Sequence, residues 1–402
     1  MPYSFPRPTY RGPDTDAFGN LRVSSPLLLL EEKAVTASPN VGNLATGGAS
    51  VSRQAARSSF YLTTGGAGSK ATRQTRQRAP YQPGKSQKIN VTFTAGTQAP
   101  GIVQRIGYFD DNNGLFFEIN GTDLYFVVRS DVSGSPVDTK TARVSWVNEN
   151  GDNEPLDGTG PSGIALDLTK SQILQIDFQW LGVGASRFGF VIDGRPITCH
   201  VNLRANRGAG VYMRVPNQPL RWQIEAVGVA TVSALEAICG SVNSEGGFET
   251  RGLNVAFDND GVGKSINGAG YTELLAVRLN TNGLASGTAV PLSFSLLCST
   301  TSSFLAELWL NATGMSAGTT WASPTGSLIE GCFDRTGNYT GGVKLKSLYC
   351  SASANILTQE IPPLTGLGYD INTSLADVFS LRVYNLSGNN TYYGSINMRQ
   401  EA

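Results

Sequence analysis

The sequence contains few of the residues on which most catalytic and metal sites depend. One histidine, His200, is present among 402 residues, which excludes a metal site built from several imidazoles. The five cysteines form no CxxC pair, so no zinc site is expected, and no motif predicts a cofactor. We expect buried free thiols, with one or two disulfides as the alternative, at Cys199, Cys239, Cys298, Cys332 and Cys350.

Long apolar runs and helix-favouring runs are also missing. No apolar stretch approaches the roughly 20 residues of a membrane helix, and "MPYSFPRPTYRGPD" has no apolar segment typical of a signal peptide. We therefore expect neither a membrane partner nor secretion through a leader. The 47 glycines, together with many Ser, Thr and Asn residues, supply turn formers. This composition predicts an all-β chain of many short strands.

Charge is scarce and unevenly distributed. Only 15% of residues are charged, with 31 basic and 31 acidic, which is low for a freely soluble enzyme and indicates a surface that is uncharged or covered by partners. Residues 1–90 nevertheless contain 12 basic and 4 acidic side chains. This basic segment could dock on its own chain, on other subunits or on nucleic acid. We favour protein over nucleic acid, because the aromatic residues are not interleaved with the basic ones.

Residues 1–85 are predicted to form an extended anchoring arm. Proline at positions 2, 6, 8, 13, 26 and 39 opposes helices and central strands. Apolar side chains in "DAFGNLRVSSPLLLLEE" would add to a partner's surface, and arginines further along would meet acidic surfaces of partners. The predicted anchor residues are Phe18, Leu21, Arg22, Val23, Leu27, Leu28, Arg73, Arg76 and Arg78.

Two β-sandwich domains are predicted after the arm, over residues 86–244 and 245–402. In the first, segments such as "KINVTFTAG" and "DLYFVVRS" alternate with period two between Asn-Gly and Asp-Gly turns. In the second, seven short strand segments are separated by Gly, Asn and Ser. Only "TVSALEAICGSVN" is predicted as a short helix, because Val232, Leu235, Ile238 and Cys239 share one 3.6-period face.

The segment "FDDNNG" gathers four oxygen-bearing side chains, those of Asp110, Asp111, Asn112 and Asn113. An EF-hand loop that began at Asp110 would need glycine at its sixth position and glutamate at its twelfth. Here Gly114 is at the fifth position and Gly121 at the twelfth, so the spacing does not match. We predict a tight turn between strands, and a calcium or glycan site built from two loops remains the alternative.

Glycoside hydrolysis by paired carboxylates is the enzymatic alternative. Its candidates on predicted strands are Glu118, Asp177 and Glu225. No constellation of carboxylates occurs on one face of one strand, and His200 alternates with strand residues as a structural side chain would. We therefore predict a protein that is not an enzyme.

Several ordered segments resemble a group of structural proteins of tailed bacteriophages, including cyanophages. They are "DAFGNLRVSSP", "RAPYQPGKSQ", "RIGYFDDNNGLFFEINGTDLYFVVRS", "LDGTGPSGIALDLTKSQILQIDFQWLGVG", "FGFVIDG" and "ICGSVNSEGGFETRGL". The resemblance implies a virion component assembled in the host cytoplasm, attached to capsid, neck or tail subunits. It also implies a homo-oligomer, such as a trimer or a ring.

The central region is also similar to concanavalin-like or laminin-G-like jelly rolls, a likeness of fold that carries no activity with it. Lectins of this shape bind sugars through rim loops. The corresponding loops here would be Asp110–Asn113 and residues 148–163. The alternative function is therefore a tail-fibre-like adhesin that recognises glycans on the host surface.

Overall fold

The computed structural model describes residues 26–402 except 250, 317, 319, 352–355, 361–365 and 402. The chain divides into two compact units, Met1–Glu249 (unit 1) and Thr250–Ala402 (unit 2). Antiparallel sheets account for most of both units, which confirms the all-β prediction. No helix in the described ranges is long and apolar enough to cross a membrane.

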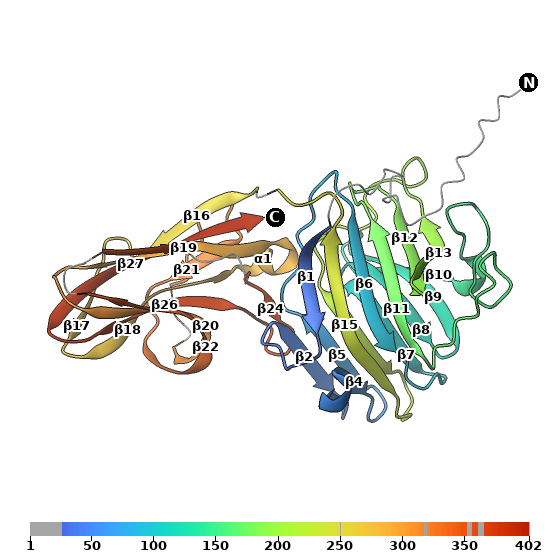
Figure 1. Ribbon diagram of the computed structural model, residues 1–402, viewed down its shortest axis with the longest axis horizontal. Helices are drawn as coiled ribbons and strands as arrows, with labels where there is room; N and C mark the ends of the chain where they lie inside the picture. The colour runs from blue at the N-terminus through green and yellow to red at the C-terminus, as the bar shows by residue number, and fades with distance from the viewer. Residues whose placement is uncertain are drawn as a thin grey trace, which may run out of the picture. The chain divides into compact units, whose positions relative to one another are not determined.

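Unit 1 is a sandwich of two antiparallel sheets (Figure 1). The first, called sheet 1A, has the order β13 (Arg195–Asn202), β12 (Ser186–Ile192), β11 (Ser171–Phe178), β6 (Gln87–Thr94), β15 (Ala234–Ser244), β4 (Ser59–Thr63) and β3 (Ser50–Gln54), with β1 (Leu27–Lys33) also paired to β15. The second, called sheet 1B, has the order β10 (Val137–Ala142), β9 (Asp123–Ser130), β8 (Gly114–Asn120), β7 (Ile102–Phe109), β14 (Leu220–Ala226), β5 (Lys70–Thr75) and β2 (Val41–Thr46). The chain crosses between the sheets repeatedly, as in a jelly roll.

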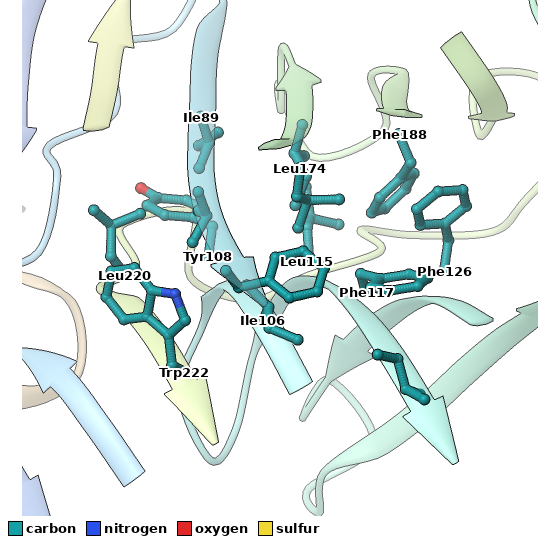
Figure 2. Close-up of a cluster of buried hydrophobic side chains, with 14 of the residues drawn as sticks. Ile89, Ile106, Tyr108, Leu115, Phe117, Phe126, Leu174, Phe188, Leu220 and Trp222 are labelled. Atoms are coloured by element: carbon teal, nitrogen blue, oxygen red, sulfur yellow. The ribbon is translucent and has the colours of Figure 1, made fainter. Parts of the chain in front are cut away.

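The core of unit 1 lies between these two sheets. Alternate residues of each strand point inward, because successive side chains of a strand point to opposite faces. Figure 2 shows Ile89, Leu174 and Phe188 from sheet 1A meeting Phe117 and Trp222 from sheet 1B. All five side chains are at most 1% exposed. This packing sets which residues of each strand face outward.

The hairpin turns follow the predicted residue chemistry. Between β12 and β13, Asp193 and Gly194 have φ values of +51° and +73°. A two-residue hairpin turn of type I′ needs positive φ at both central positions, which Asp-Gly tolerates well. The dipeptide therefore fixes the register of the two strands that it joins.

The predicted boundary of the arm is wrong for residues 26–85. Five strands, β1 to β5, lie within this range and pair inside both sheets of unit 1. Period-two alternation explains this result, since Phe60 and Leu62 of β4 are buried in the core. Pro26 precedes β1, and the prolines at positions 39, 80 and 83 fall between strands, so they interrupt none of them. The part of the predicted arm over residues 1–25 lies outside the described residues.

The predicted helix over "TVSALEAICGSVN" is also wrong, because these residues contribute to strand β15. A bulge between Ala237 and Cys239 adds one residue to the strand. The inward positions therefore change from Leu235 and Ala237 to Gly240 and Val242. This change of phase imitates helical spacing in the sequence.

Unit 2 is a smaller sandwich with a core of its own. Sheet 2A has the order β16 (Leu253–Asp258), β27 (Asn389–Glu401), β19 (Thr288–Cys298) and β23 (Ile356–Glu360), with β17 (Lys264–Asn267) also paired to β27. Sheet 2B has the order β21 (Ile329–Cys332), β18 (Gly270–Leu279), β26 (Val378–Asn385), β20 (Phe304–Met315) and β22 (Gly337–Cys350). The remaining elements are α1 (Thr281–Ser286), the pair β24 (Tyr369–Asp370) and β25 (Leu375–Ala376), and two 3-10 turns in unit 1, η2 (Ala55–Arg57) and η3 (Arg143–Ser145). All seven strand segments predicted for this part of the chain lie in strands.

Candidate functional site

The "DDNNG" segment forms the turn between β7 and β8, as predicted. Asp110 Oδ1 accepts hydrogen bonds from the backbone N–H groups of Asn112 and Asn113, each at 2.7 Å. The Asp110 N–H donates to the carbonyl oxygen of Asn113 at 2.9 Å, and Gly114 follows with φ +145°. The acidic side chain therefore closes the turn on its own backbone.

Three further oxygen atoms of this turn face cationic or donor groups. Arg78 donates to Asp110 Oδ2 at 2.7 Å, and Arg221 donates to Asp111 Oδ1 at 2.6 Å. Asn113 Oδ1 accepts from the backbone of Arg214 at 3.0 Å. A calcium ion bound to Asp110 Oδ2 would have to displace Arg78, and one bound to Asp111 Oδ1 would have to displace Arg221. Within the described ranges, no group of three or more His, Cys, Asp or Glu residues could hold a metal ion.

Glu118 lies on the outer face of sheet 1B and is fully buried there by side chains. Arg105 Nε binds Glu118 Oε2 at 2.7 Å, and Lys140 Nζ binds Oε1 at 2.5 Å. The NH1 atom of the same arginine lies 3.0 Å from Glu225 Oε2. The Arg105 guanidinium therefore bridges Glu118 and Glu225, the two candidate carboxylates that share this face. In a catalytic pair, the substrate would have to occupy that position.

Asp177 belongs to the opposite outer face of unit 1. Its neighbours on β11, Ile176 and Phe178, are in the core, so Asp177 points away from it. The partner across the strand pair is Arg187, whose NH1 lies 3.6 Å from Asp177 Oδ2. Because two packed sheets are about 10 Å apart, Asp177 and Glu118 cannot act on one bond.

The predicted anchor residues separate into three groups. Phe18, Leu21, Arg22 and Val23 lie outside the described residues. Leu27 and Leu28, at the start of β1, are 44% and 48% exposed. The arginines, in contrast, bind within the chain.

The prediction that Arg73 and Arg78 meet acidic surfaces of partners is wrong. Arg73 is buried and its ion pair is with Glu32, while Arg78 binds Asp110 and the backbone of Asn217. Arg76 donates its backbone N–H to Asn40 at 2.8 Å. Long-range pairing of this kind depends on the fold, so a local sequence pattern could not show it.

The surroundings of His200 and of the cysteines do not resemble those of catalytic side chains. His200 Nδ1 accepts from the backbone N–H of Val147 at 3.4 Å, and burial lowers the pKa of the imidazole. Burial raises the pKa of the Cys199 thiol, which makes it a poor nucleophile. All five cysteines are free thiols, and Cys239 is exposed where we expected burial.

A charged cluster on unit 2 was missed from the sequence. It occupies the outer face of sheet 2B, where Glu273, Arg382 and Glu307 lie opposite one another on three adjacent strands. Arg382 Nε donates to Glu307 Oε2 at 2.8 Å, and Lys344 Nζ lies 2.6 Å from Glu307 Oε1. Little in the sequence indicates this cluster, because each residue is an isolated charge on a separate strand.

Aromatic rings cover the guanidinium of this cluster. Arg382 Cζ lies 3.9 Å from the ring centroid of Tyr271 and 4.2 Å from that of Tyr339. Tyr339 in turn donates its hydroxyl to Glu273 Oε2 at 2.6 Å. We name Tyr271, Glu273, Glu307, Tyr339, Lys344 and Arg382 the sheet 2B network.

The two carboxyl groups of the sheet 2B network have different pKa values. Burial raises the pKa of Glu273, although Arg335 opposes this effect. Burial also acts to raise the pKa of Glu307, but hydrogen bonds from Lys344 and Arg382 outweigh it and lower the pKa. Divergent pKa values are typical of acid–base pairs. Here both carboxylates are at most 3% exposed and are held by cations and a phenol, so the arrangement is that of a rigid structural network.

Comparison with known proteins assigns neither a family nor a function to the chain. No family model and no curated protein matches the chain. Similar solved structures include a legume lectin-like domain from Entamoeba histolytica (11% identity, TM-score 0.28, covering 50% of this chain and 89% of that one) and a β-glucanase from Bacillus licheniformis (12%, 0.33, 55% and 98%). A carbohydrate esterase of a Shiga toxin-encoding bacteriophage is a third (13%, 0.29, 55% and 99%). At these TM-scores the similarity carries no argument about this chain.

Proposed function

We propose that this chain is a structural, non-enzymatic component of a tailed-bacteriophage particle that displays two β-sandwich units. The ordered segments that resemble phage structural proteins support the particle assignment. One observation carries the non-enzymatic part: Glu118 and Asp177 lie on opposite outer faces of unit 1, each beside an arginine. A glycoside hydrolase of the paired-carboxylate type would need two carboxylates free to reach the same bond.

Attachment is assigned to the N-terminal end of unit 1. Leu27 and Leu28 are adjacent, exposed leucines at the start of β1, directly after the segment with the phage-like motif. As consecutive strand residues their side chains point to opposite faces of β1, and each exposes apolar surface that a bound partner would cover. The partners would be capsid, neck or tail subunits and further copies of this chain.

Incorporation into particles tests this attachment. We compare the intact chain with one that lacks residues 1–25 and with L27S/L28S, using quantitative mass spectrometry of gradient-purified particles. Deletion of residues 1–25 removes none of the described strands, and incorporation should fall at least about tenfold if this segment carries the attachment. Thermal unfolding of the truncated chain identifies any loss that comes from unfolding. L203S changes a leucine that is 46% exposed elsewhere in unit 1 and is the control. Normal incorporation of both variants would refute the attachment.

The adhesin alternative receives no support from the predicted Asp110–Asn113 loop. Both Asp110 carboxylate oxygens and Asp111 Oδ1 already bind Arg78, Arg221 or backbone groups, which removes three acceptors from binding sugar hydroxyls. We therefore assign no glycan to this loop. A sugar site, where present, has to be sought elsewhere on the chain.

A further inference from the structure

We infer that a groove on the outer face of sheet 2A binds a neutral sugar ring. The groove encloses about 270 Å³ and is lined by side chains from three strands and one turn. Its principal residues are Asp258, Asn259, Ser295, Leu297, Tyr393 and Ser395. Such a site lies beyond the structural role proposed for the chain and does not depend on it.

The rim of the groove is held rigidly by Asn259, which is 4% exposed. Its backbone N–H donates to the Gly394 carbonyl at 3.3 Å, and its Oδ1 accepts from the Gly394 N–H at 3.1 Å. Its Nδ2 donates to the carbonyl of Val262 at 2.8 Å. The turn between β16 and β17 is therefore fixed to β27, and the groove needs little ordering when a ligand binds.

One half of the groove is polar. Asp258 Oδ1 accepts from the Asp260 N–H at 2.7 Å, whereas Oδ2 makes no hydrogen bond or ion pair within the part of the chain that the structure describes. The hydroxyls of Ser295 and Ser395 lie 2.7 Å apart, and each keeps further hydrogen-bonding capacity. A carboxylate beside two hydroxyls suits a ligand that brings several O–H donors.

The other half of the groove is apolar. Tyr393 and Leu297 face each other across β27 and β19, and Leu297 is 38% exposed. A Cβ placed on Gly263 would lie 2.8 Å from Tyr393 Cζ, so the glycine backbone packs directly against the ring. An aromatic ring beside hydroxyls and a carboxylate matches a sugar, which has an apolar C–H face and a rim of hydroxyls.

The charge of the groove selects the class of sugar. Asp258 is the only ionisable acid or base among the residues that line it, apart from the weakly acidic phenol of Tyr393. A uronate, a phosphate or another anion would meet this carboxylate without a compensating cation. The occupant is therefore a neutral pyranose, either free or at the end of a glycan.

Saturation-transfer NMR on the full chain tests the proposal. The probes are the methyl glycosides of glucose, galactose, mannose and N-acetylglucosamine, with glucuronic acid as the anionic comparison. We expect at least one neutral glycoside to bind, and glucuronic acid to bind at least about tenfold more weakly. D258N should weaken binding at least about tenfold and still fold, because asparagine can accept the Asp260 hydrogen bond.

Two further variants locate the site. Y393L removes the ring and should also weaken binding at least about tenfold. D193N changes an exposed aspartate in a turn of unit 1 and should leave binding unchanged. The proposal is overturned when no neutral glycoside binds, when glucuronic acid binds equally well, or when D258N binds as the unmodified chain does.

Discussion

The Arg73 guanidinium lies buried against the Glu32 carboxylate, although the two residues are 41 positions apart in the sequence. Arg73 is 2% exposed and Glu32 4% exposed, and Arg73 Cζ lies 3.6 Å from the ring centroid of Phe60. Asn43 accepts a further hydrogen bond from Arg73 at 2.9 Å. Residues from β1, β2, β4 and β5 thus meet at one buried charge, which makes the N-terminal strands part of unit 1.

Glu32→Gln should destabilise unit 1 by about 3–5 kcal/mol, because it leaves the Arg73 charge buried without a counter-ion. Replacement of both partners, as in E32L/R73M, should recover most of this loss, since the unpaired charge is gone. Urea unfolding followed by hydrogen exchange of unit 1 peptides measures both effects. Glu31, whose side chain is 45% exposed, supplies the control E31Q, which should change stability by less than about 0.5 kcal/mol.

Glu307→Gln should destabilise unit 2, and the loss should depend on pH. The folded-state pKa of Glu307 is below its ordinary value of 4.5, so its stabilisation is present above pH 4.5 and is lost as the pH falls through the lower folded-state pKa. At about pH 7 the loss should be about 3–5 kcal/mol, because Arg382 stays buried.

Urea midpoints of unit 2 at about pH 7 and about pH 3.5 check this prediction, and the difference between the intact chain and E307Q should shrink at the lower pH. D260N changes an exposed aspartate in a turn and is the control. An equal difference at both pH values would contradict the role assigned to the ionised Glu307.

Gly114→Ala should destabilise unit 1 by about 1–3 kcal/mol or more. Gly114 has φ +145°, and an added Cβ would lie 2.2 Å from Phe109 Cβ. Thermal unfolding measures the effect. Gly66 has an ordinary φ and no atom nearer than 3.9 Å to an added Cβ, so G66A should be nearly neutral. Equal stability of the two variants would show that the turn tolerates a side chain.

Calcium should leave the stability of unit 1 unchanged. Arg78 and Arg221 already neutralise Asp110 and Asp111, so these carboxylates attract a second cation only weakly. The Tm in millimolar calcium chloride and in chelator should agree within about 1 °C, because a ligand that binds the folded state raises the Tm. A Tm that is clearly higher in calcium chloride than in chelator would instead support a calcium site built from two loops.

Local pattern was enough to predict most of the strands after residue 86 and a turn between two of them. Period-two alternation located β9 and β14, and the Asp-Gly dipeptide at 193–194 located a hairpin. Local pattern gave a wrong prediction for β15, where a helix was expected. The one extra residue of the bulge changes which positions of the strand are buried. Prolines were given too much weight over residues 26–85, where they separate strands.

The charged sites could not be predicted from local pattern. Arg73 with Glu32, and Glu307 with Arg382, are paired through strand order, which a single sequence does not reveal. The groove of sheet 2A likewise joins Asp258 to Ser295 and Tyr393 through β27. Residue types in each segment were visible, but their juxtaposition required the sheet topology.

The most direct test of the central claim is the amount of this chain in purified phage particles. Quantitative mass spectrometry of particles from a density gradient should find it at a constant ratio to the major capsid protein. Particles that lack the chain, with all of it free in the lysate, would contradict a structural role in the virion.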